Sequence, residues 1–416
     1  MDARASWNAR YLQRRRARHL GLYLMGLLLV LLVLAQSCGS FQNASSGTSS
    51  DTSSSSTSPN ASEKRGPYAN GESEASGDRG GLFGLGGGED RGREGDKEAE
   101  EPDKPYAAIP PPKGSEPLRD RFEDDGAGEQ YGADPYNGAF SEEGSLQAGR
   151  MLVRGAEDPS DGPLKENRLV TYYGTPLSGY MGILGELPPE QMMRQLKKQT
   201  RAYSAADPER PAVPTIELIA SVAQRNPGPD GLYLQATPEK EIRRYARLAK
   251  ENDALLLLDI QLGRDQVMNE VRRLEPFLKQ EHVHLAIDTE YSVNAGQVPG
   301  VDLGTVSGYE VQQAVRYMDR LVEKEDIPDK LVVVHQFETG IVYGKQNIQP
   351  TDDVQVSLNA DGFGRAPNKL TKYDTLVRQQ PIQYGGFKVF YRQDYPILSP
   401  DEVLQLEPAP AVVNYQ

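Results

Sequence analysis

The chain has 416 residues, of which 46 are Lys or Arg and 60 are Asp or Glu, so its formal net charge is −14. This balance argues against a nucleic-acid-binding protein, because neutralising phosphates requires a basic face. A single cysteine excludes a disulfide framework and any zinc site built from cysteines.

The first 38 residues have the layout of an export signal. Six arginines within residues 4–18 precede an uncharged apolar run over 20–35. This run is shorter than the roughly 20 residues that a helix needs to span a bilayer, and it matches the apolar region of a secretory signal. Because basic residues remain on the cytoplasmic side, we expect the rest of the chain to be exported.

Cys38 ends this region and directly follows Ser37. The arrangement resembles bacterial lipoprotein signals, in which a small residue precedes a cysteine that is acylated and becomes the new N-terminus. The resemblance implies lipidation of Cys38 and anchoring to the cell membrane outside the cytoplasm. Two alternatives stay open, namely an uncleaved signal anchor over 20–37 and complete release of the exported chain.

Residues 39–164 have the composition of a disordered linker. Ser, Thr, Gly and Asn dominate residues 39–62, and the remainder adds acidic clusters, a glycine-rich stretch at 80–88 and three prolines at 110–112. Such a sequence buries too little apolar surface to offset chain entropy. With about 120 flexible residues, its root-mean-square reach is on the order of 60 Å. We therefore expect a tether that holds the folded part away from the bilayer.

Residues 165–416 alternate between apolar runs of strand length and helical patterns. We predict strands at 169–173, 212–221, 254–260, 283–287, 331–334, 354–358 and 386–391, and helices at 189–203, 238–251, 264–278, 307–325, 367–379 and 400–406. Continuous apolar strands such as 254–260 indicate a parallel sheet that helices cover on both faces. About 250 residues fit a single (β/α)8-type (TIM-like) barrel, and a doubly wound open sheet is the alternative.

An eighth strand is not evident in this pattern. Residues 231–235 (GLYLQ) supply a short candidate, and otherwise the barrel is irregular. No phosphate-binding turn follows the first strand, because the Gly-Thr-Pro sequence at 174–176 lacks the required glycine spacing. The pattern therefore favours a barrel over a nucleotide-binding fold.

Polar side chains stand repeatedly at the carboxyl ends of the predicted strands, where barrel enzymes carry their chemistry. These residues are Glu217, Asp259, Gln261, Asp288, Glu290, His335, Gln336, Asn359, Asp361 and Tyr391. Helix capping accounts for one or two of the carboxylates, such as Asp265 or Asp361. It accounts less well for Asp259, Asp288 and Glu290, because like charges that converge at a barrel mouth repel one another. We therefore expect a functional site there.

Asp288 and Glu290 are the most informative pair. Residues two apart on a strand point to the same side, so these two carboxylates are expected to be neighbours. The charge of one raises the pKa of the other. A raised pKa is what a carboxylic acid needs to donate a proton to a glycosidic oxygen near neutral pH. The segment 286–291 (AIDTEY) resembles the D-x-E strand of barrel glycosidases, including family 25 muramidases and family 18 chitinases. The resemblance implies that Glu290 is the catalytic acid and Asp288 its catalytic partner. As substrate-binding or stabilising groups we assign Asp259, His335, Gln336, Asp361 and Tyr391.

His335 is the only histidine placed at a predicted strand end on the mouth side. A metal site that joins it to Asp259, Asp288 and Glu290 is one interpretation. Because no second histidine accompanies it, we favour a neutral His335 that orients a carboxylate by a hydrogen bond. We therefore expect neither a metal nor another cofactor.

Two functions follow from these expectations. The first is a membrane-tethered, glycosidase-like hydrolase that acts on a cell-wall or extracellular glycan. The second is a non-catalytic surface lipoprotein that binds a glycan or a protein. The scarcity of Trp (1, against 21 Tyr) favours the second, because Trp commonly stacks on sugars in glycosidase clefts. The expected partners are the membrane and a cell-wall glycan, and no nucleic acid.

Overall fold

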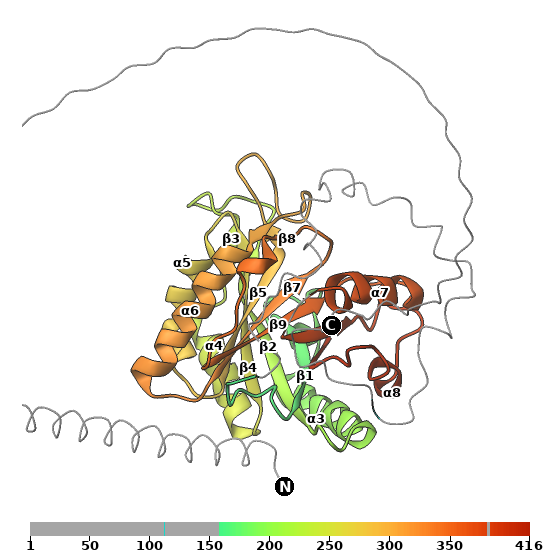
Figure 1. Ribbon diagram of the computed structural model, residues 1–416. Coiled ribbons are helices and arrows are strands. Elements are labelled where there is room, and N and C mark those ends of the chain that lie inside the picture. The colour runs from blue at the N-terminus through green and yellow to red at the C-terminus, as the bar shows by residue number, and fades with distance from the viewer. Residues whose placement is uncertain (1–111, 113–157, 381–382) are drawn as a thin grey trace, which may run out of the picture. The chain divides into compact units, whose positions relative to one another are not determined.

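A computed structural model describes residues 112, 158–380 and 383–416 (Figure 1). The predictions for the signal region 1–38, for Cys38 and for nearly all of the linker 39–164 fall outside these residues. Within the described ranges, no helix combines the length and the hydropathy that crossing a bilayer requires.

The described chain forms a closed barrel of eight parallel strands with helices between them, as the alternating pattern predicts (Figure 1). The barrel strands are β1 (Arg168–Gly174), β2 (Ala212–Ala223), β4 (Leu255–Gly263), β5 (Val283–Ser292), β7 (Lys330–Gln336), β9 (Val354–Ala360), β10 (Tyr384–Val389) and β11 (Val412–Tyr415). They neighbour one another in chain order, and β1 pairs with both β2 and β11, which closes the sheet. The open-sheet alternative is therefore wrong.

The eighth barrel strand is β11, at the carboxyl end of the chain, and not the segment 231–235. That segment overlaps β3 (Leu234–Ala236), which pairs antiparallel with the end of β2 and lies outside the ring. Only four residues form β11, and they follow a Pro-rich segment at 408–410. So short a run gives little periodicity from which to predict a strand. Two further short strands, β6 (Val306–Ser307) and β8 (Val342–Tyr343), pair with each other beside the barrel.

Helices lie on the outside of the sheet, and all of them except Ile183–Glu186 overlap a predicted helix. They are α2 (Ile183–Glu186), α3 (Pro189–Ala206), α4 (Glu239–Glu251), α5 (Val267–Leu278), α6 (Gly308–Glu325), α7 (Ala366–Tyr373) and α8 (Pro400–Val403), with a 3-10 turn at Lys345–Asn347 and a π turn at Asp374–Arg378. The start of α6 is fixed by a capping box, in which the Ser307 hydroxyl accepts from the Glu310 backbone N–H and the Glu310 carboxylate accepts from the Ser307 N–H. Each helix buries apolar side chains against its surroundings, so the helices cover the outer face of the barrel sheet.

The interior of the barrel divides into two halves along the strands. Near the amino ends, apolar side chains fill it, including Leu255, Leu257, Leu331 and Val333. Residues 158–164 contact this end, where Leu164 joins the apolar cluster. The Asp158 carboxylate there accepts hydrogen bonds from Gln355 Nε2 at 2.7 Å and the Tyr384 hydroxyl at 2.6 Å. Toward the carboxyl ends the inward-facing side chains become polar.

Candidate active site

The polar half of the interior is built by inward-facing residues from seven of the eight strands and one loop. They are Tyr173 on β1, Glu217 on β2, Asp259 and Gln261 on β4, Asp288 and Glu290 on β5, His335 on β7, Asp361 after β9, Lys388 on β10 and Asn414 on β11. Pairs such as Asp259 with Gln261 are two residues apart, so strand alternation turns both inward. Barrel interiors are more often filled by branched apolar side chains. The polar centre of this barrel is therefore unusual.

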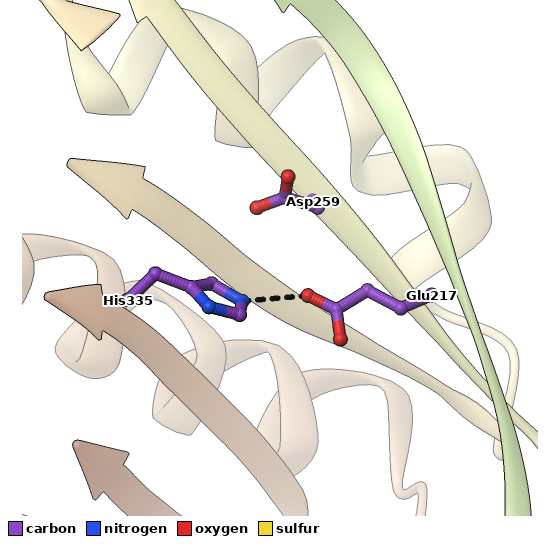
Figure 2. Close-up of side chains that lie close together, drawn as sticks. All are labelled: Glu217, Asp259 and His335. Atoms are coloured by element: carbon purple, nitrogen blue, oxygen red, sulfur yellow. Dashed lines mark hydrogen bonds and ion pairs between the residues drawn. The ribbon is translucent and has the colours of Figure 1, made fainter. Parts of the chain in front are cut away.

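His335 holds two carboxylates, one with each ring nitrogen. Its Nε2 lies 2.7 Å from Glu217 Oε1 (Figure 2), and its Nδ1 lies 3.0 Å from both oxygens of Asp361. Asn414 Nδ2 donates to the other oxygen of Glu217. Burial alone would lower the pKa of His335, but the negative charges of Asp361 and Glu217 raise that pKa well above its usual value. The two carboxylates thus favour a protonated imidazole, and the expectation of a neutral His335 is corrected.

Lys388 is a second buried cation in this network. Its ammonium lies 2.9 Å from Asp361 Oδ2 and 3.9 Å from the centre of the Tyr173 ring. Burial would raise the pKa of Asp361, but the charges of His335 and Lys388 lower it to about 2. Asp361 is therefore ionised at neutral pH.

Tyr173 and Gln261 orient the acidic residues of β4 and β5. The Tyr173 hydroxyl contacts Asp259 Oδ2 at 3.2 Å and Asp288 Oδ2 at 3.3 Å, and Gln261 Nε2 donates to the same Asp288 oxygen at 3.2 Å. Burial raises the pKa of both carboxyl groups, and the charge of Asp288 adds to the effect on Asp259. The nearby His335 cation opposes the rise at each of them.

Glu290 differs from the other acidic residues because it is half-buried, whereas Glu217, Asp259 and Asp288 are at most 3% exposed. Burial and the charge of Asp288 raise the pKa of Glu290 to about 8, although Lys388 and a hydrogen bond with Tyr291 oppose the rise. Within this cluster Glu290 is thus a carboxylic acid that keeps its proton near neutral pH and has access to solvent.

Two of the residues assigned to substrate binding lie away from the cluster. Gln336 follows the inward-facing His335, so it points to the opposite side of β7, where its Nε2 donates to the Leu376 carbonyl at 3.3 Å. Tyr391 stacks on Tyr415 at 5.1 Å between ring centres, and its hydroxyl contacts that of Tyr172 at 3.4 Å. Neither side chain contacts the acidic network, and the assignment of both residues to substrate binding stays a prediction.

Three members of the network were not predicted, namely Tyr173, Lys388 and Asn414. Lys388 interrupts the apolar run of β10, which is a recognisable signal, because a lysine in a buried strand needs an anionic partner. Asn414 lies on the strand that was itself missed. Tyr173 gives no comparable signal, because tyrosines are frequent along this chain.

One part of the network also has the ligand set for a metal ion. Glu217, Asp259 and His335 each present one ligand atom, and these three atoms lie within 4.8 Å of one another (Figure 2). Asp288 and Glu290, which the sequence interpretation grouped with His335 as ligands, are not members of this trio.

No protein-family model and no curated protein sequence matches this chain. Among solved structures, the crystal structure of a GH18 chitinase from Pseudoalteromonas aurantia is similar over 60% of this chain and 94% of that chain, with 13% sequence identity and a TM-score of 0.31. A similarity of this size indicates nothing about the activity of this chain.

Proposed function

We propose that the protein is a glycoside-hydrolase-like enzyme that acts on a cell-wall or extracellular glycan, with Glu290 as its general acid. The observation that carries the proposal is the position of Glu290, half-buried at the carboxyl end of β5 beside Asp288, with a pKa of about 8. Glycosidic cleavage needs a carboxylic acid that is still protonated at working pH and a second charged group nearby.

The reaction assigns a separate task to each carboxyl group. Glu290 transfers its proton to the glycosidic oxygen as the bond between that oxygen and the anomeric carbon breaks, and the bonding electrons leave with the oxygen. The Asp288 carboxylate stabilises the positive charge that develops on the sugar. Water then adds to the anomeric carbon, and its released proton returns to Glu290. Tyr173 and Gln261 hold the Asp288 carboxylate in one orientation throughout.

A second candidate function is glycan or protein binding without catalysis. Nine large apolar side chains are exposed in the described part of the chain. Seven lie in segments that follow a barrel strand, Tyr309 lies in the first turn of α6, and Tyr343 lies on β8. The nine are Leu177, Tyr180, Val301, Tyr309, Tyr343, Phe363, Tyr391, Tyr395 and Ile397. Exposed apolar groups gathered at one end of a protein favour a binding surface there, whether or not a bond is broken.

Substitution of Glu290 by Gln tests the first candidate. The change removes the transferable proton but keeps the size and the neutral charge of the acid, so we expect hydrolysis to fall by about 10²–10⁴-fold with little change in the thermal midpoint. The assay measures new reducing ends released from purified peptidoglycan and from a panel of soluble polysaccharides. Glu281→Gln, at an exposed site just before the amino end of β5, is the matched control.

Equal rates of release by the wild type and Glu290→Gln would refute the assignment of the acid. Binding to a glycan of the panel without any release by the wild type would support the non-catalytic candidate instead.

We also propose that residues 1–38 direct export and that Cys38 anchors the protein to the outer face of the cell membrane through a lipid. The proposal rests on the sequence pattern alone. In a bacterial host, Cys38→Ser should abolish incorporation of labelled palmitate and move the protein from the membrane fraction to the soluble fraction. Retention of the variant in membranes would favour the uncleaved anchor.

A further inference from the structure

We propose that Glu217, Asp259 and His335 form a binding site for a single divalent transition-metal ion, with zinc as the preferred ion. The three residues come from β2, β4 and β7, and each is at most 1% exposed. Their ligand atoms lie within 4.8 Å of one another, and Figure 2 shows the Asp259 carboxylate facing the Glu217–His335 pair. Its three ligands do not include Asp288 or Glu290, the residues assigned to acid catalysis.

The outer atoms of all three side chains are already held by partners. Asp361 contacts His335 Nδ1 at 3.0 Å, which leaves Nε2 for the site. Asn414 donates to Glu217 Oε2, and the Tyr173 hydroxyl contacts Asp259 Oδ2 at 3.2 Å. Metal-binding histidines and carboxylates are typically oriented by such outer contacts, above all by a carboxylate on the second histidine nitrogen.

An unpartnered buried oxygen provides an independent indication. Asp259 Oδ1 is buried and has no hydrogen-bond partner among the described residues, although its side chain lies in the centre of the barrel. A buried polar atom without a partner is costly, and in a native protein it often marks an unseen ion or water. A cation held at this trio would give that oxygen a ligand bond.

The ligand types select the class of metal. One imidazole nitrogen with two carboxylate oxygens suits zinc and similar transition ions better than magnesium or calcium, which prefer oxygen alone. Two carboxylates also balance the charge of a divalent ion. Bonds of about 2.0–2.2 Å to one tetrahedral zinc place the ligand atoms about 3.3–3.6 Å apart. Zinc would therefore replace the proton between His335 Nε2 and Glu217 Oε1, now 2.7 Å apart, and widen that contact.

Zinc binding to the purified full-length chain tests the site. After removal of metal with a chelator, zinc is titrated in competition with a chromophoric chelator. We expect one zinc ion per chain, with affinity at least tenfold weaker in Asp259→Asn and in Glu217→Gln. His282→Gln is the matched control, because His282 contacts the Ala246 carbonyl away from the site. Residues outside the described ranges, such as His19 and Cys38, are unchanged in all of these variants.

Unchanged zinc affinity in both carboxylate variants, or no zinc bound by the wild type, would overturn the proposal. If the variants do not fold, as circular dichroism would reveal, the wild type decides the question with cobalt. Cobalt(II) in this site should give visible absorption of a low-coordinate nitrogen and oxygen complex that zinc removes, and a spectrum of hydrated cobalt alone would overturn the site. Glu290→Gln should keep full zinc affinity, which separates this test from that of the proposed enzyme.

Discussion

Lys388 is the residue whose removal should perturb the barrel centre most clearly. Its side chain is only 5% exposed, and its ammonium pairs with Asp361 at 2.9 Å over the face of Tyr173. Lys388→Met keeps the length of the side chain but removes the charge. Asp361 then retains His335 as a partner but loses one of two cations, so a buried negative charge is left partly uncompensated.

We expect Lys388→Met to lower the free energy of unfolding by about 3–5 kcal/mol, the usual cost of removing one partner of a buried ion pair. Lys369→Met is the matched control, because Lys369 is also buried and pairs with Asp394 at 2.8 Å. Both variants should lose stability. Of these two lysines, Lys388 is the one whose charge lowers the pKa of Glu290, so we expect its removal, and not that of Lys369, to raise that pKa further above about 8.

Urea denaturation gives the stability of the wild type and the two variants. The pKa is followed by carboxyl carbon NMR of protein labelled at glutamate, with Glu290→Gln used to assign the signal. The reasoning is refuted if Lys388→Met unfolds at the wild-type urea concentration, or if its Glu290 signal titrates at or below the wild-type pH. A shift of equal size in Lys369→Met would also refute it.

Two further predictions concern pH and packing. Hydrolysis should decline as the pH rises through about 8, because Glu290 must keep its proton to act; a pH–rate profile without this alkaline decline contradicts the assignment. The free energy of unfolding should also fall as the pH rises from about 4.5 to 8, because the Glu290 carboxyl loses its proton at a lower pH in the unfolded chain than in the folded one. In urea denaturation at a series of pH values, Glu290→Gln should show a smaller dependence of this free energy on pH. In Gly386→Ala the new Cβ would lie 1.6 Å from Asn359 Oδ1, so we expect a loss of about 1–3 kcal/mol by urea denaturation. Gly179→Ala, whose nearest atom is at 3.6 Å, should match the wild type, and equal midpoints for both variants would contradict the packing argument.

The barrel was predictable because its strands are long apolar runs separated by amphipathic helices. β4 is buried along its whole length, and only a strand covered on both faces carries so continuous an apolar sequence. The last strand was not predictable in the same way. β11 owes its place to pairing with both β1 and β10. β1 is distant from it in the sequence, and an irregular connection separates it from β10. Closure of a barrel is a tertiary property that four residues do not encode locally.

Strand alternation predicts which neighbouring residues of one strand face the site together, and only this part of the site could be predicted from the sequence. Asp288 and Glu290 are two apart on β5, and the rise in the Glu290 pKa has the Asp288 charge as one cause. The same rule shows why His335 and its neighbour Gln336 do not both face the interior. The contacts of His335 with Glu217 and Asp361 join residues 118 and 26 positions apart, and no local pattern specifies such pairs.

Stability alone is a poor explanation for the polar centre of this barrel. Each buried ion loses hydration worth several kcal/mol, and well-packed apolar residues of similar volume commonly serve a fold as well or better. The apolar half around Leu257 and Val333 shows that this barrel accommodates such packing. His335 and Lys388 nevertheless lie among Glu217, Asp361 and Asp288, and their positive charges oppose the rise in the Asp288 pKa. The two cations therefore hold the pKa of Asp288 below the level that burial alone would set, which is the direction that a charged partner of the proposed acid Glu290 needs.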